Sequence, residues 1–131
     1  MFLLDTNAVI AALKGQERVL SRIRAQSPRD VSMSSIVAHE LYYGAFKSQR
    51  LAENLDRVDA IQFPVIEFDR DDARSAGEIR AQLGFAGTPI GPYDVLIAGQ
   101  ALSRSLVLVT RNGREFARVD GLKIEDWEGT T

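Results

Sequence analysis

Short apolar runs alternate along the chain with longer segments in which apolar side chains recur every third or fourth residue. Apolar runs bounded by turn-forming residues predict buried strands, and the longer period predicts amphipathic helices. Strands that alternate with helices favour an α/β domain with a parallel sheet. The expected strands are Phe2 to Asp5, Val31 to Met33, Val65 to Phe68, Leu106 to Val109 and Leu122 to Glu125.

The expected helices fill the segments between these strands. They are Asn7 to Leu13, Glu17 to Gln26, Ser34 or Ser35 to about Ser48, Leu51 to Ile61, Asp69 to Leu83 and Tyr93 to Ser103. The last helix is apolar on nearly all sides, so we expect it to be buried. A glycine- and proline-rich loop over residues 84–92 precedes it, and Arg111-Asn112-Gly113 is expected to form a turn. No repeat or linker divides residues 1–131, which predicts a single domain.

The composition is ordinary for a globular protein, with 45% hydrophobic and 26% charged residues. No apolar stretch is long enough to span a membrane, and the first residues lack the pattern of a signal peptide. We therefore expect a cytoplasmic protein with no membrane partner. The net charge of -2 gives no global basic character, so any binding of nucleic acid must depend on local basic patches.

The residue types that are missing narrow the choice of metal. Cysteine is absent and His39 is the single histidine, which excludes thiolate sites and multi-histidine zinc sites. Any metal must be bound through oxygen, and oxygen ligands favour Mg²⁺ or Mn²⁺.

Three acidic residues stand where core-facing residues are expected. Asp5 ends the first apolar run, Glu40 lies within a mostly apolar helical stretch, and Asp94 opens the buried helix. An unpaired buried carboxylate costs on the order of several kcal/mol, but a shared cation would offset this cost. The three acids therefore predict a divalent-metal site, and with it hydrolytic or phosphoryl chemistry.

The same edge of the predicted sheet carries further polar residues. Asp5 and the segment from Thr110 to Asn112 follow strands, and ligands of open parallel sheets bind at the carboxyl ends of the strands. Asn112 could supply a neutral oxygen ligand, and Glu115 could reach in as a further acid.

Structural roles are also open for each of these residues. Asp5 and Asp94 could cap their helices or interact with the helix dipole. Glu40 could lie at the margin of its apolar stripe and reach into solvent. Asn112 could belong to an ordinary Asn-Gly turn that is followed by a surface Glu115.

Four segments together resemble the PIN-domain ribonucleases, and more narrowly the VapC-type toxins of bacterial toxin–antitoxin pairs. They are Phe2-Leu3-Leu4-Asp5-Thr6-Asn7, Glu40 on the third helix, Ile90 to Ala98, and Leu108 to Phe116. The resemblance covers essentially the whole chain, including Glu125-Asp126-Trp127. It implies a three-layer α/β/α sandwich with a central, mostly parallel sheet of four to five strands. It also implies Mg²⁺ or Mn²⁺ in an acidic pocket, endoribonuclease activity, a homodimer and a cognate antitoxin.

The resemblance further implies roles for individual residues. The three central acids of the family match Asp5, Glu40 and Asp94, which would hold the metal. The fourth acidic position of many PIN domains is Asn112 here, which weakens the expectation of a tightly bound second metal. Glu115 could compensate.

The implied mechanism is in-line attack of water on an RNA phosphodiester. Asp5 and Asp94 would ligate the metal, and Glu40 would ligate it or orient the attacking water. Products with a 5′-phosphate and a 3′-hydroxyl are expected from the family, and a structured RNA such as tRNA is a plausible substrate.

Other residues near the acids are candidates for positioning and for contacts with the substrate. The polar positions that orient the acids in the family match Thr6 and Thr110. Arg111, Arg114 and Arg118 could contact the RNA backbone, or could belong to a solvated surface of mixed charge.

Two other functions compete with the nuclease. A haloacid-dehalogenase-like phosphatase also has a nucleophilic Asp at the end of its first strand, but it needs a second acid where this chain has Asn7. A PIN-like module that binds RNA or protein without cutting is made credible by Asn112. Tyr42, Tyr43 and Phe46 could form a subunit or antitoxin contact, or belong to the core.

Overall fold

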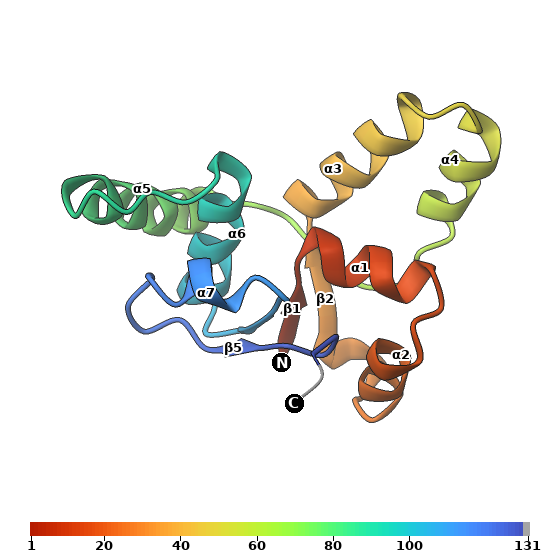
Figure 1. Cartoon of the computed structure of the whole chain (residues 1–131), viewed down its shortest axis with the longest axis horizontal. Helices are drawn as coiled ribbons and strands as arrows, with labels where there is room; N and C mark the ends of the chain where they lie inside the picture. The colour runs from red at the N-terminus through yellow and green to blue at the C-terminus, as the bar shows by residue number, and fades with distance from the viewer. Residues whose placement is uncertain (130–131) are drawn as a thin grey trace.

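A sheet of five parallel strands, in the order β3-β2-β1-β4-β5, forms the centre of the molecule. The structure is a computed structural model that describes residues 1–129 (Figure 1). The strands are β1 (Phe2–Leu4), β2 (Val31–Ser34), β3 (Val65–Ile66), β4 (Val107–Val109) and β5 (Ile124–Glu125). Leu3 of the central strand β1 lies opposite Ser32 and Leu108 and is fully buried. The predicted α/β class and parallel sheet are confirmed.

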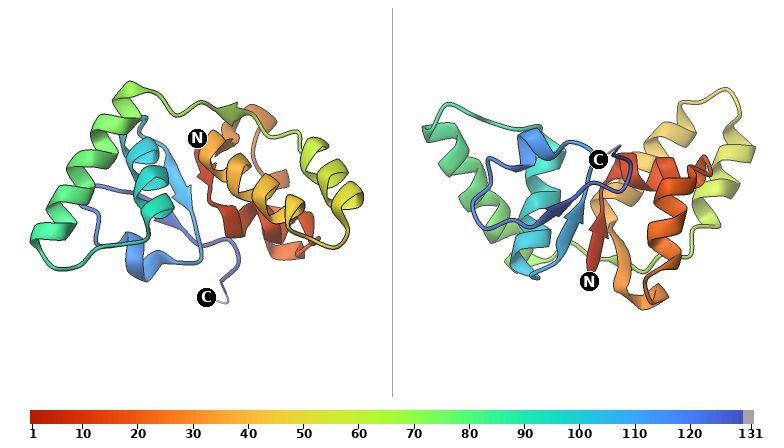
Figure 2. Two further views of the ribbon diagram at one scale, coloured as in Figure 1. Left: turned by 90° about the horizontal axis from the view of Figure 1, so that it is seen from above. Right: turned by 60° about the horizontal axis from the view of Figure 1, so that its bottom comes forward.

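Helices cover both faces of this sheet. They are α1 (Thr6–Leu13), α2 (Glu17–Arg24), α3 (Ser35–Phe46), α4 (Leu51–Asp59), α5 (Arg70–Phe85), α6 (Pro92–Ser103) and α7 (Gly113–Phe116), with a 3₁₀ turn at Pro28–Asp30. Right-handed crossovers place α1 to α4 on one side and α5 to α7 on the other (Figures 1 and 2). Within residues 1–129, no helix combines the length and the apolar character needed to cross a membrane.

Helices α5 and α6 pack with their backbones in close contact. A Cβ atom built on Gly99 of α6 would lie 2.6 Å from the Cα, Cβ and N atoms of Ala76 on α5. Val95, Ile97 and Ala98 of α6 are buried, as the apolar pattern predicts, whereas Tyr93 in its first turn is exposed. Only glycine permits this approach of the two helices.

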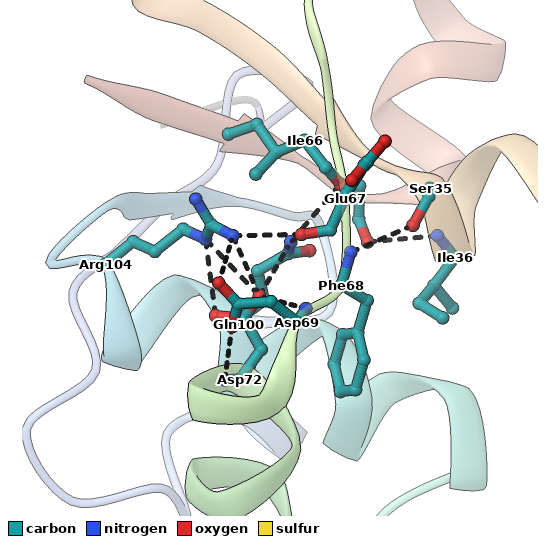
Figure 3. A network of polar contacts seen from close by, with 10 residues as sticks. Ser35, Ile36, Ile66, Glu67, Phe68, Asp69, Asp72, Gln100 and Arg104 are labelled. Atoms are coloured by element: carbon teal, nitrogen blue, oxygen red, sulfur yellow. Dashed lines mark hydrogen bonds and ion pairs between the residues drawn. The ribbon is translucent and has the colours of Figure 1, made fainter.

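A polar network connects the start of α5 to the end of α6 (Figure 3). Asp72 and Asp69 form a capping box, with hydrogen bonds of 2.9 and 3.0 Å between each backbone N–H and the other side chain. The Gln100 Nε2 and Arg104 Nη2 atoms donate to Asp72 at 3.2 and 3.1 Å. Burial raises the pKa of Asp72, but the hydrogen bonds and the charge of Arg104 outweigh this effect and lower it. The amphipathic pattern did not predict this fully buried acid.

Several predicted boundaries are wrong by a few residues. Strand β3 ends at Ile66, because the N–H of Phe68 donates to Ser35 Oγ at 3.2 Å rather than to a strand. Helix α5 continues through Gly84 to Phe85, and β5 begins only at Ile124.

The predicted turn at Arg111-Asn112-Gly113 continues into a helical turn, α7. The Asn112 carbonyl accepts hydrogen bonds from the N–H groups of Glu115 and Phe116, at 3.1 and 3.3 Å. Phe116 is buried, and the burial of its ring stabilises the helical turn. Glu115 is therefore part of a helix and only partly exposed, rather than a surface residue after an open turn.

Candidate functional site

The carboxyl edge of the sheet gathers side chains from segments that are far apart in the sequence. Asp5 follows β1 and Thr110 follows β4, and the Asp5 N–H donates to the Val109 carbonyl at 3.0 Å. Glu40 lies on α3, which begins at the end of β2. Helix α6 runs back toward the start of β4, so Asp94 in its first turn also lies at this edge.

Asp5 is buried and fixed at the start of α1. Its side chain accepts a hydrogen bond from the Ala8 N–H at 2.9 Å, so Asp5 is the N-cap of this helix, one of the two roles left open by the sequence. Burial raises the pKa of Asp5. Hydrogen bonds from Thr110 and Ala8 and the charge of Arg111 oppose this rise, whereas the charge of Glu40 adds to it.

Glu40 is partly buried and points toward the start of α1. The Thr6 hydroxyl donates to Glu40 Oε1 at 3.0 Å, across two helices. Thr6 therefore fixes one carboxylate oxygen of Glu40 beside the N-cap Asp5.

Asp94 shows most clearly that the acids share one environment. Burial raises its pKa to about 6, with further contributions from the negative charges of Asp5, Glu115 and Glu40. Asp94 does not cap its helix, because Gly91 is the N-cap residue and no side chain caps this end. A Cβ atom on Gly91 would lie 3.1 Å from Asp94 Oδ2, so the glycine leaves room for this carboxylate.

Asn112 orients its neighbours in this cluster. Its Nδ2 atom donates to Glu115 Oε2 at 3.2 Å, and its backbone N–H donates to Thr110 Oγ1 at 2.9 Å. Thr110 is buried and in turn bonds to Asp5. The residues after β4 therefore position both a central acid and an additional one.

The three candidate arginines differ in their surroundings. Arg118 Nη1 donates to the Pro89 carbonyl at 3.1 Å and so binds the glycine- and proline-rich loop. Arg111 and Arg114 are exposed, and Arg111 Nη1 lies 3.8 Å from Glu128 Oε1. Arg118 is exposed as well, but its guanidinium is engaged by the loop, whereas Arg111 and Arg114 donate no hydrogen bond within residues 1–129.

Glu128 is an acid at this site that sequence reasoning missed. Burial raises its pKa; the charge of Arg111 opposes this rise, and the charge of Asp5 adds to it. The one signal in the sequence was the position of Glu128 just after the last predicted strand. That signal places Glu128 at the site only if β5 is known to pair with β4.

The chemistry of this cluster fits a hard divalent cation. Its donors are carboxylate oxygens, and their shared negative charge makes a proton or a cation favourable. Within the part of the chain that the structure describes, no three acidic or histidine side chains stand close enough together to form a ready-made coordination sphere. Ligation by several of these acids would therefore require side-chain rotation.

An apolar groove adjoins the acidic cluster. It lies between α1, α3 and α4. Its lining is mainly apolar, formed by Ile10, Leu13, Leu41, Gly44, Ala45 and Val58, and it also includes Lys14, Glu40, Asn54 and Arg57. On α3, Tyr43 and Phe46 are exposed, so the interpretation that places them in the core is wrong, whereas Tyr42 is partly buried and bonds to Asp59.

Comparison with known proteins gives consistent matches along the chain. The PIN domain family matches residues 2–122. The tRNA(fMet)-specific endonuclease VapC of Salmonella typhimurium is 45% identical over 129 residues, which cover 96% of this chain and 97% of the relative. Ribonuclease VapC2 of Haemophilus influenzae is 37% identical, with the same coverage of 96% and 97%.

Solved structures show the same similarity in three dimensions. DNA-bound VapBC from Salmonella typhimurium contains a chain with a TM-score of 0.91 and 46% identity, covering 96% of this chain and 97% of that one. VapBC2 from Rickettsia felis, bound to a fragment of its promoter DNA, also gives a TM-score of 0.91, at 32% identity and with coverage of 96% and 98%.

Proposed function

Since the chain belongs to the PIN-domain family and, within it, to the VapC ribonucleases, the toxins of VapBC pairs, we propose that its acidic cluster binds a divalent cation and hydrolyses RNA. Asp5, Glu40 and Asp94 are the proposed ligands. The observation that carries this proposal is the pKa of Asp94, which burial and the charges of Asp5, Glu115 and Glu40 raise to about 6. Carboxylates whose charges act on one another in a partly buried pocket favour a cation.

Each residue of the cluster has a distinct task in this proposal. A bound Mg²⁺ or Mn²⁺ would neutralise the acids and stabilise the charge that develops on the phosphate. Thr6 holds one oxygen of Glu40, which leaves the second oxygen to bind the cation or to orient the attacking water. Thr110 holds Asp5, and Asn112 holds Glu115 near Asp94.

The exposed arginines Arg111 and Arg114 are the proposed contacts to the RNA backbone. Arginine binds phosphate through paired N–H donors, and such contacts position RNA without reading its sequence. Because the chain as a whole carries a charge of -2, these local contacts must bring the RNA to the acidic pocket. By its similarity to the Salmonella enzyme, the substrate is initiator tRNA.

Cleavage of defined tRNAs tests both the reaction and the substrate. Purified protein is incubated with initiator or elongator methionine tRNA transcripts, with Mg²⁺, Mn²⁺ or EDTA. We expect the initiator tRNA to be cut in the presence of either metal, and to remain intact with EDTA. Asp94→Asn should slow the cut roughly 100-fold or more, whereas Asp71→Asn, an exposed acid on α5, should have no effect.

The possible outcomes separate the competing functions. Cleavage that persists in EDTA would rule out the metal mechanism. Equal cleavage of both tRNAs would support the nuclease activity but contradict the proposed preference for initiator tRNA. Release of phosphate from small esters with intact RNA would favour the phosphatase, and RNA binding without a cut would favour the non-catalytic module.

We further infer that the groove between α1, α3 and α4 receives a segment of the cognate antitoxin. Its lining is mainly apolar and includes Glu40, so a partner there would block the acidic cluster. Gly44→Leu tests this idea, since a Cβ on Gly44 meets nothing within 4 Å and the new side chain would fill the groove. We expect weaker antitoxin binding for this variant and unchanged binding for Gly77→Leu on α5. Equal affinities would contradict this location.

The remaining expectations concern the whole chain. We propose one PIN domain over residues 1–131 that acts in the cytoplasm as a homodimer. Phe85, at the end of α5, has 92% of its surface exposed and is a candidate for the subunit contact. Phe85→Ser should shift the protein toward monomer in analytical ultracentrifugation, and an unchanged dimer would place the contact elsewhere.

A further inference from the structure

The segment after β5 is held firmly against the body of the molecule. Trp127 is buried and packs against Phe2, with ring centroids 5.0 Å apart. Its Nε1 atom donates to Glu125 Oε1 at 2.9 Å. These contacts fix the start of the segment beside strand β1.

A tight turn then directs the chain toward the acidic cluster. Asp126 Oδ1 accepts hydrogen bonds from the backbone N–H groups of Glu128 and Gly129, both at 2.9 Å. Arg18 Nη1 donates to the Gly129 carbonyl and holds the far end of the turn on α2. The contacts of Asp126 and Arg18 with this turn therefore position Glu128 at the carboxyl edge of the sheet.

Glu128 is largely enclosed at this position, since only 11% of its side chain is exposed. One carboxylate oxygen, Oε1, faces Arg111 Nη1 at 3.8 Å. The other, Oε2, is buried and has no hydrogen-bond partner among residues 1–129. Burial of this carboxylate carries a desolvation cost, and its ion pair of 3.8 Å is too long to offset that cost in full.

Arg111 has two acidic neighbours, and its choice between them matters for the site. Its positive charge acts on both Asp5 and Glu128. Within the described residues it forms an ion pair only with Glu128, and none with Asp5 lies within 4.0 Å. A guanidinium placed against Asp5 would neutralise that carboxylate and repel a cation bound there.

We propose that Glu128 is a positioning residue that holds Arg111 at the rim of the acidic cluster and away from Asp5, so that arginine and cation do not compete. The inference rests on the proposed function, because it concerns the same cation. Arg111 keeps 59% of its side chain exposed in this position and stays accessible to an RNA phosphate. Glu128 thus keeps the guanidinium of Arg111 apart from the place where the cation would bind.

Binding of Mn²⁺ to the protein alone, measured by calorimetry, tests the proposal without RNA or activity. Four proteins are compared: wild type, Glu128→Gln, Arg111→Gln and the double variant. Released from Glu128, Arg111 should move onto Asp5 and weaken Mn²⁺ binding about tenfold, a change of about 1.4 kcal/mol. In the absence of Arg111, the same Glu128→Gln change should weaken binding by less than about threefold, because only distant charge is lost.

Each alternative outcome has a separate meaning. An equal loss in both backgrounds would show that Glu128 acts only through its charge, and no loss in either would show that it has no role; both overturn the inference. A wild type that binds no Mn²⁺ would overturn the proposed function together with the inference. Glu17→Gln, an exposed acid on α2, is the matched control and should bind Mn²⁺ as wild type does, and thermal unfolding checks that every variant folds.

Discussion

The carboxylates at the carboxyl edge of the sheet repel one another and are held in place by neutral hydrogen-bond donors. Thr6, Thr110 and Asn112 each bond to an acid or to a residue that bonds to one. These donors fix positions but do not cancel charge. At the scale of single residues, the site therefore stores electrostatic repulsion that a proton or a cation can relieve.

Asp94→Asn should remove part of this repulsion and stabilise the metal-free protein at neutral pH. The pKa of Asp94 is about 6 in the folded protein, above its ordinary 3.8, so the folded state binds the proton more tightly than the unfolded state. The associated stability is present below about pH 4 and is lost as the pH rises through about 6. In EDTA, the variant should melt above wild type at pH 7.5 and equally near pH 4. A constant difference at both pH values would contradict the assignment, and Asp71→Asn should follow wild type.

Asn112→Asp should add an acid at the position that the resemblance matches to a fourth acidic residue. The new carboxylate would lie beside Glu115, where the Asn112 amide now donates a hydrogen bond of 3.2 Å. We expect Mn²⁺ affinity to rise by roughly tenfold and the metal-free protein to lose stability, because a further negative charge joins the cluster. Asn112→Ala, which removes the hydrogen bond without adding charge, should not raise the affinity. Titration with Mn²⁺ and thermal melts in EDTA measure both effects.

Among the elements, α6 has its position constrained by several contacts that depend on particular residues. It carries Asp94 at its first turn, it is buried along most of its length, and it contacts α5 through Gly99 and Ala76. The network of Asp72, Gln100 and Arg104 fixes its other end to the start of α5 (Figure 3). The position of Asp94 therefore depends on how closely these two helices approach.

Gly99→Ala should destabilise the fold by about 2 kcal/mol. The added Cβ would lie 2.6 Å from the backbone of Ala76, so the helices must separate. Gly77→Ala on α5 is the matched control, since nothing lies within 4 Å of its Cβ, and it should be neutral or stabilising by up to about 1 kcal/mol. Urea denaturation of both variants measures the difference. Similar stabilities for the two would show that the α5–α6 contact is adaptable.

Considered as a whole, the molecule places its acids on elements from both sides of the sheet. Helices α3 and α6 lie on opposite faces of the sheet (Figure 2). Glu40 is on α3, Asp94 is on α6, and Asp5 follows the central strand β1. A cation held by all three would connect the two helical layers. Its binding should therefore stabilise the complete fold rather than one segment.

Addition of Mn²⁺ should raise the melting temperature of the protein. At a concentration 100 times the dissociation constant, binding to the folded state contributes about 2.7 kcal/mol, or a shift of roughly 10 °C for a chain of this size. EDTA should reverse the shift, and Asp5→Asn should reduce it. Sodium chloride at the same ionic strength is the control, and an equal shift with this salt would contradict specific binding.

Much of this architecture is readable from local pattern. The apolar runs identify all five strands and the amphipathic periods identify the long helices. This is possible because the spacing of apolar residues within a segment reflects which of its faces is buried. The acids Asp5, Glu40 and Asp94 are conspicuous for the same reason, since each interrupts an apolar pattern. Motif order along the chain was sufficient for the family, which the comparisons confirm.

Only the tertiary structure decided which side chains meet. The pairing of Thr6 with Glu40, the burial of Asp72 against Arg104, and the approach of Glu128 to Arg111 each join residues that are distant in the sequence. No local period encodes the strand order or the packing of α5 on α6, which bring these residues together. The sequence alone determined which segments form strands and helices and which acids interrupt them, because local apolar pattern records whether a residue is buried. The strand order and the packing of the helices determined which side chains contact one another.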